Sequence, residues 1–269
     1  MEYKVKFNLV LGSCLVHLIG CGEIADIQES IDGFTNTTAI EAIILGVIPP
    51  ESEALPDDIA EIMSAGTSFK ALVVDADAVA AMETAIPIDN ASVWVEGAPM
   101  GTIAAYSLLE GLYTLEPGMG LEYAPGETWN IGVMVPGAED AGQVKITLPA
   151  ATEFTLPKTS PVGASMVLDV SGQGFNWAFV IVTNVLSGEV TYTNEDEVSS
   201  VVDIYEVTHG ESTISNVSIP GVAFPVAGVY AVGVAGMVHQ GESAASNVNT
   251  LLSGAIAGQM RIEVITLGG

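Results

Sequence analysis

The sequence predicts an all-β protein built as two tandem β-sandwiches, with one short helix near the C-terminus. Apolar residues make up 49% of the 269 residues, which is enough for a sizeable core. Gly (29) and Pro (13) recur between short apolar runs, as turn residues do between strands. Several of these runs alternate apolar and polar residues, the two-residue period of a half-buried strand.

The first element, residues 1–20, has the features of a secretory signal peptide. Two lysines precede the apolar run "FNLVLGSCLVHLIG", which is too short to span a bilayer comfortably. The run ends in "LIGC", which resembles the lipobox of bacterial lipoproteins. The resemblance implies cleavage between Gly20 and Cys21 and acylation of the Cys21 thiol. A buried N-terminal strand and an uncleaved membrane anchor are the alternative interpretations.

Processing at Cys21 removes Cys14, which ends a poorer second lipobox, "LGSC". The mature chain then has no pair of thiols, so its stability must come from packing. Several acyl chains, at about 0.8 kcal/mol per buried CH₂, give lasting anchorage. By the same resemblance, Gly22 after the cysteine favours the outer membrane over the inner one. We therefore expect a lipid-anchored protein of the bacterial outer membrane, on either its periplasmic or its surface face.

The charge balance excludes several partners. With 6 Lys and Arg against 33 Asp and Glu, the formal net charge is -27. Such a surface repels nucleic-acid phosphates and anionic lipid headgroups, so we expect neither as a direct partner. Residues 21–38 are acidic and polar, and we expect them to be a tether between the lipid and the folded part.

Residues 39–150 are expected to form the first β-sandwich. The opening apolar run, "AIEAIILGVIPP", fits either a strand or a short helix. In "NASVWVEG", Val93 and Val95 share one face of a strand. The runs "GTIAAYSLLE", "GLYTLEPG", "ETWNIGVMV" and "GQVKITLP" follow at the short intervals typical of a sandwich.

Three of these stretches carry a family resemblance. "NASVWVEG", "GLYTL" and "PGETWNIGV" resemble the carboxypeptidase-regulatory-like, transthyretin-like sandwich domains of bacterial surface proteins, over roughly residues 68–148. Asn90 stands where that family has Gly, and Trp129 where it has Tyr. The resemblance implies a small Ig-like, Greek-key sandwich that serves as a spacer or binding module and not as a catalyst.

Residues 151–269 are expected to form the second β-sandwich, because the proline-rich "PAATEFTLPKTSP" is the best domain boundary. Its strands are expected in "SMVLDVSG", "NWAFVIVTN", "GEVTYTNE", "SVVDIYEVT", "STISNVSIP", "GVYAVGVAGMV" and "MRIEVITL". Between the last two, apolar residues from Ala244 to Ile256 recur at helical spacing, which predicts the one helix, with Ser243 as its cap.

Catalytic motifs are missing from the sequence. There is no G-x-S-x-G and no Ser three residues before a Lys. His209 and His239 are too few for an ordinary zinc site, and we expect each in a turn or on the surface. "GQGFNW" begins like a dinucleotide loop, but Trp177 replaces its third Gly. We interpret it as a tight turn that delivers Phe175 and Trp177 to a core.

Two acidic clusters are candidate Ca²⁺ sites, since carboxylate oxygens on loops are the ligands this ion prefers. They comprise Asp75 and Asp77 in the first, and Glu195, Asp196 and Glu197 in the second. The first lacks a third ligand at Val79 and the bidentate Glu of an EF-hand. Charged, solvated turns are therefore the alternative, and no cofactor other than Ca²⁺ is expected.

We expect a non-enzymatic protein with a binding, adhesive or structural role towards an unknown protein or glycan partner. No ladder of exposed Trp and Tyr indicates a carbohydrate platform, which leaves only Trp94 and Trp129 open as side chains that contact a glycan. One alternative is an exported hydrolase with a site made of carboxylates alone, as in glycosidases. The other is an envelope-assembly accessory that holds Ca²⁺.

Overall fold

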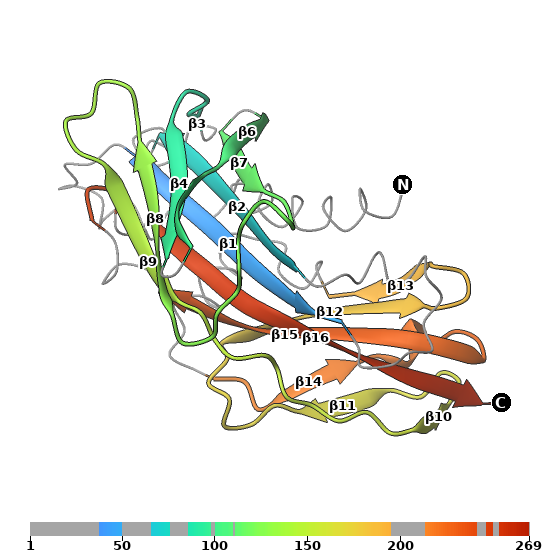
Figure 1. Ribbon diagram of the computed structural model, residues 1–269. Helices are drawn as coiled ribbons and strands as arrows, with labels where there is room; N and C mark the ends of the chain where they lie inside the picture. Colours follow the sequence, from blue (N-terminus) through green and yellow to red (C-terminus); the bar gives the residue numbers. More distant parts are fainter. Residues whose placement is uncertain are drawn as a thin grey trace, which may run out of the picture.

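The computed structural model describes residues 38–49, 66–75, 86–97, 100–109, 111–194, 213–240, 246–249 and 253–268. In these ranges every regular element is a β-strand except one 3-10 turn (Figure 1). The elements are β1 (Thr38–Ile48), β2 (Gly66–Asp75), β3 (Ile86–Pro87), β4 (Ser92–Gly97), β5 (Gly101–Ala104), β6 (Tyr106–Leu109), β7 (Leu112–Leu115), β8 (Thr128–Met134), β9 (Gly142–Thr147), β10 (Thr159–Pro161), β11 (Met166–Asp169), β12 (Trp177–Asn184), β13 (Val190–Thr193), β14 (Asn216–Ile219), the 3-10 turn η3 (Gly221–Ala223), β15 (Gly228–Gln240) and β16 (Gly254–Gly268).

A ten-stranded sheet runs the length of the molecule in the order β13-β12-β15-β16-β1-β2-β7-β6. Off this path, β10 pairs with β16 and β3 with β2. β16 is parallel to β1 and β10, and the other pairs are antiparallel. Its long strands β15 and β16, of 13 and 15 residues, lie side by side away from its edges (Figure 1).

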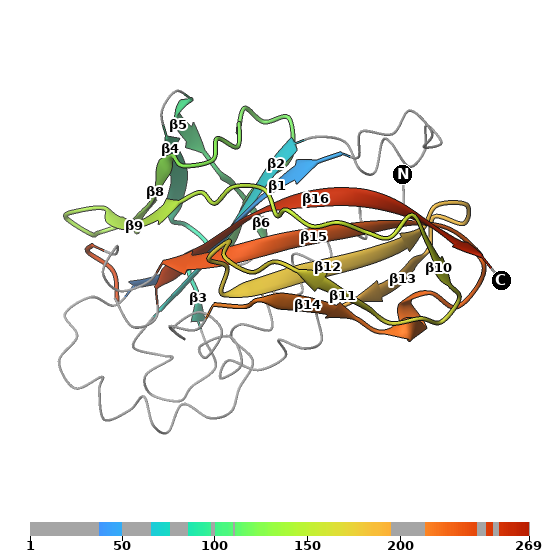
Figure 2. The same cartoon turned by 90° about the horizontal axis from the view of Figure 1, so that it is seen from below.

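Two small sheets cover one face of this large sheet at its two ends (Figures 1 and 2). Alternate residues of β16 show this: Ala255 and Ala257 pack under the sheet β5-β4-β8-β9, whereas Ile265 and Leu267 pack under the pair β11-β14. We name the two interiors the four-strand core and the two-strand core. Sheets packed face to face over a shared core are the sandwich arrangement, so the predicted all-β sandwich class is confirmed.

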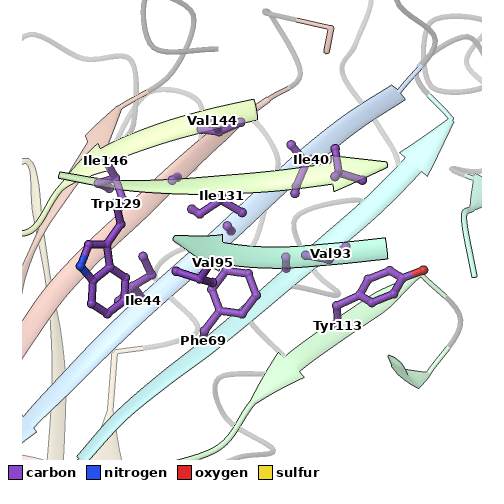
Figure 3. Close-up of a cluster of buried hydrophobic side chains, with 14 of the residues drawn as sticks. Ile40, Ile44, Phe69, Val93, Val95, Tyr113, Trp129, Ile131, Val144 and Ile146 are labelled. Atoms are coloured by element: carbon purple, nitrogen blue, oxygen red, sulfur yellow. The ribbon is translucent and has the colours of Figure 1, made fainter. Parts of the chain in front are cut away.

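The four-strand core follows from the predicted alternation. Val93 and Val95 of β4 point inward and meet Ile131 of β8 and Ile44 of β1 (Figure 3). Trp129 on β8 is fully buried at one end of this cluster.

The opposite face of the large sheet carries a third cluster, the back-face cluster, built from side chains of the large sheet's own strands and the residue after β12. β1 contributes to both faces, since Ile40 and Ile44 point to the four-strand core while Ile43 and Leu45 point to the back face. A strand buried on both faces is almost continuously apolar, which periodicity cannot distinguish from a buried helix. The structure resolves the ambiguity of "AIEAIILGVIPP" in favour of a strand.

The predicted helix from Ala244 to Ile256 is wrong for its described residues. Ala255 and Ile256 lie in β16, and Ser246 forms an isolated bridge with Gln143 of β9. Ala255 is buried in one face of the large sheet and Ile256 packs on the other, so apolar residues follow one another without strand alternation. The short helix in the described chain is the 3-10 turn η3 instead.

The division at residues 150 and 151 stays a prediction about domain organisation. In the structure the ten-stranded sheet takes β1, β2, β6 and β7 from one side of that division and β12, β13, β15 and β16 from the other. The segment 149–158 runs between the two covering sheets, where Thr152 is buried and its hydroxyl accepts a hydrogen bond from the Gly236 amide.

Candidate binding surface

The lipidation and cleavage residues Gly20 and Cys21 lie outside the described residues, as do the signal peptide, most of the tether and the expected strand "SVVDIYEVT". Among the described elements no helix is long and apolar enough to cross a membrane.

Only Asp75 of the candidate Ca²⁺ ligands is described. It lies half-buried at the end of β2, opposite Thr38 of β1 and Ile86 of β3. Asp77, Glu195, Asp196 and Glu197 lie outside the described residues. No group of three or more His, Cys, Asp or Glu side chains able to hold a metal occurs within the described ranges. The Ca²⁺ site stays a prediction.

The turn predicted from "GQGFNW" is confirmed. Gly172 and Gly174 have φ angles of 75° and 78°, which glycine adopts without strain. Phe175 is buried against Gly236, while Trp177 is half-buried beside the back-face cluster.

The remaining candidate residues for glycan or metal binding differ in how deeply they are buried. Trp129 is fully buried and therefore cannot contact a glycan. Trp94 is half-buried on the outer face of β4, where its indole lies against Gly132. His239 is half-buried within β15, near its end, and so lies in a strand and not in the expected turn, and His209 lies outside the described residues.

The register of the large sheet separates two ends of the molecule. Glu41 of β1 lies beside Gly254 at the start of β16, so Thr38 enters the fold at that end. The other end of β16 lies beside the start of β15, because Leu267 pairs with Gly228. At roughly 3.3 Å per residue, the 15 residues of β16 place the two ends roughly 50 Å apart.

Three connections meet at the end far from Thr38, and we name them together the loop tip: residues 162–165, 185–189 and 220–227. They join β10 to β11, β12 to β13 and β14 to β15. In Figure 1 they lie at the right-hand end, where β10, the β12–β13 hairpin and the end of β16 come together.

Hydrogen bonds hold the three connections in one surface. The Gly163 amide donates to the Phe224 carbonyl at 3.0 Å, which joins the first connection to the third. The Thr191 hydroxyl donates to the Ala223 carbonyl at 2.7 Å, which fastens β13 to η3. The Val185 amide donates to the Val229 carbonyl at 2.9 Å, which closes the hairpin against β15. The loop tip is therefore a defined surface.

The loop tip exposes aliphatic side chains. Leu186 and Val222 are 79% and 77% exposed. The other exposed apolar side chains are Val162, Pro225, Val226 and Ala227. Glu189 is the one ionisable residue of these connections, in a chain of net charge -27. Apolar residues with a deficit of charge characterise the centre of protein–protein interfaces.

The sequence reasoning did not find the loop tip. Its signal is the apolar content of the connections themselves, "VGAS", "VLSGE" and "PGVAFPVA", where turns usually carry charged or polar residues. The three stretches are far apart in the sequence, and only the strand register brings them together.

Two ionisable residues of the large sheet face the back-face cluster. Burial raises the pKa of Glu41 from 4.5 to about 8, since its carboxyl lies among apolar side chains even though the residue as a whole is half-buried. Lys70 is 3% exposed on the neighbouring strand, where it pairs with Ile43 in register.

No protein-family model matches the chain, and no curated protein matches it. Among solved structures, the crystal structure of DIP-gamma IG1+IG2 is similar to 86% of this chain over 98% of its own length. The identity is 9% and the TM-score is 0.21, so this likeness supports no functional argument.

Proposed function

We propose that this protein is a lipid-anchored, non-enzymatic binding protein of the bacterial outer membrane, and that its loop tip contacts a protein partner. The observation that carries the binding role is the gathering of exposed aliphatic side chains and a single carboxylate on hydrogen-bonded loops. Aliphatic side chains favour a protein over a glycan, since sugars are bound mainly by aromatic platforms and by hydrogen-bonding groups.

The placement of the loop tip supports an anchored presentation. The chain enters the fold at Thr38, at the end of the large sheet opposite the loop tip. With lipid on Cys21, residues 22–37 could extend roughly 50 Å from the membrane before the fold begins. The loop tip would then face away from the attachment point.

The lipid anchor is tested by metabolic labelling with palmitate. We expect label on the native chain and none on Cys21→Ala, which would accumulate unprocessed or be released from membranes. Label that persists in Cys21→Ala, or is absent from the native chain, would contradict the anchor.

The binding role is tested separately by crosslinking in intact cells. A double variant, Leu186→Asp with Val222→Asp, places two charges in the loop tip and should abolish the crosslinked complex. The matched control is Ile86→Asp, because Ile86 is an exposed apolar residue (51%) on β3, outside the loop tip. Equal crosslinking in both proteins would exclude the loop tip as the binding surface.

A further inference from the structure

A second surface, separate from the loop tip, lies at one edge of the ten-stranded sheet. β6 is the end strand of that sheet, and within the described residues it pairs only with β7. Its outer row of N–H and C=O groups is the kind of edge to which another strand can add.

The side chains of β6 do not protect this edge. Tyr106, Leu108 and Leu109 are 40%, 46% and 65% exposed. Lysine and proline commonly prevent an edge strand from pairing with another chain, and neither occurs from Gly101 to Leu109. These nine consecutive residues, "GTIAAYSLL", carry no charge in a chain with 33 acidic residues.

Carboxylates flank the uncharged edge. Tyr106 pairs with Thr114 of β7, whose hydroxyl lies 3.3 Å from Glu116 Oε1. Burial and then the Glu116 charge raise the pKa of the Tyr106 phenol. Beside the next pair, Ser107 with Tyr113, burial raises the pKa of the Tyr113 phenol, the hydrogen bond with Ala91 lowers it, and the Asp89 charge raises it.

Three of the four described cations lie on elements away from β6. Lys145 is on β9, Lys158 precedes β10 and Arg261 is on β16, where it pairs with Glu263 at 2.8 Å. Lys70 is buried on β2, where it pairs with Thr114 of β7, the residue that also pairs with Tyr106 of β6. The exposed surroundings of β6 are therefore apolar along the strand and negative beside it, while Lys70, in the same cross-strand row as Tyr106, is buried.

We propose that β6 is a docking edge for an extended, basic segment of a partner protein, which adds to the sheet as a further strand. Main-chain hydrogen bonds would form along the outer side of β6, apolar side chains of the segment would contact Leu108 and Leu109, and its cations would face Glu116 and Asp89. A second copy of the chain fits less well, since pairing of two β6 strands would bring two sets of these carboxylates together.

The geometry also limits the added strand. β6 has four residues, and its register with β7 shifts between Ser107 and Leu109. A short, bulged edge pairs with only a few residues of a partner, so the charges beside it must contribute to affinity.

The test uses a short, fluorescently labelled peptide of alternating Val and Thr with lysines at both ends, titrated with the full chain. The proposal expects saturable binding that weakens with added salt and is lost when the lysines are replaced by glutamates. Leu108→Lys should weaken binding at least tenfold, whereas Val167→Lys, on the exposed face of β11, should not change it.

Glu116→Gln isolates the charge, because Gln keeps an oxygen for the Thr114 hydroxyl. It should weaken binding several-fold, with Glu96→Gln on β4 as the control. The proposal would be overturned if the basic peptide does not bind, or if the acidic peptide binds equally well. It would also be overturned if Leu108→Lys binds the peptide as the native chain does, or if the chain forms a stable dimer that Leu108→Lys dissociates. The loop-tip variants should bind the peptide normally, so the two surfaces can fail independently.

Discussion

The two ends of the large sheet carry similar layers but differ in what they expose. At the end near Thr38, four strands cover the sheet and enclose large side chains such as Trp129. At the other end two strands suffice, and the connections around them present Leu186 and Val222 to solvent. The difference indicates that both ends enclose a core that stabilises the fold, and that the second end also presents an apolar surface on its connections.

The strongest test of this comparison removes one large side chain from each core. Trp129→Ala and Phe224→Ala should each cost about 3–5 kcal/mol of unfolding free energy, because each leaves a cavity in a buried cluster. Phe224 is fully buried and packs edge-on to Tyr230, with ring centroids 5.5 Å apart.

Since both cores share the ten-stranded sheet, denaturant should unfold each variant in one transition. Two transitions, with only one displaced in each variant, would favour two independent domains divided at residues 150 and 151.

The back face should make stability depend on pH through Glu41. Its folded pKa of about 8 lies above its ordinary 4.5, so the folded state binds the proton more tightly. Below pH 4.5 the Glu41 carboxyl is protonated in both the folded and the unfolded state, so it does not lower the free energy of unfolding. As pH rises from 4.5 through about 8, the free energy of unfolding falls.

Glu41→Gln should therefore raise the unfolding free energy by on the order of 1–3 kcal/mol above pH 8 and leave it unchanged in acid. Chemical denaturation of both proteins across this range is the measurement. A gain that is independent of pH would show that burial of the charge is not the cause.

A smaller effect on the free energy of unfolding is expected from the hydrogen bond that joins β13 to η3 in the loop tip. Thr191→Val removes the hydrogen bond to the Ala223 carbonyl and should cost about 1 kcal/mol. It should also speed amide hydrogen exchange at Phe224, whose N–H bonds to the Gly221 carbonyl. Thr102→Val on exposed β5 is the control, and equal exchange in both variants would contradict the role of Thr191.

The smallest effect on stability is expected at the exposed side chains of the loop tip. Leu186→Ser should change the unfolding free energy by no more than about 0.5 kcal/mol, since the side chain is 79% exposed. A loss of several kcal/mol would mean that Leu186 supports the fold and is not available to a partner.

Local patterns predicted the strands but not their arrangement. The alternation of Val93 and Val95 gave β4 correctly, since one face of that strand is buried and the other is not. In β16, Ala255 and Ile256 are covered on opposite faces, so their spacing resembled a helix. The parallel pairing of β1 with β16 joins opposite ends of the chain, and no local signal encodes it.

The loop tip could not be predicted from the sequence for the same reason. Leu186 and Val222 belong to connections that meet only through the register of β12, β13 and β15. Sequence reasoning instead selected carboxylates and cysteines, whose chemistry is recognisable residue by residue.

The most direct test of the central claim places a photo-crosslinking amino acid at Leu186 and, in a matched protein, at Ile86. Irradiation of intact cells should give a discrete protein adduct from position 186 and none from position 86. The adduct should also be lost or reduced in Cys21→Ala, which lacks the proposed anchor. Equal adducts from both positions, or none from position 186, would contradict the account.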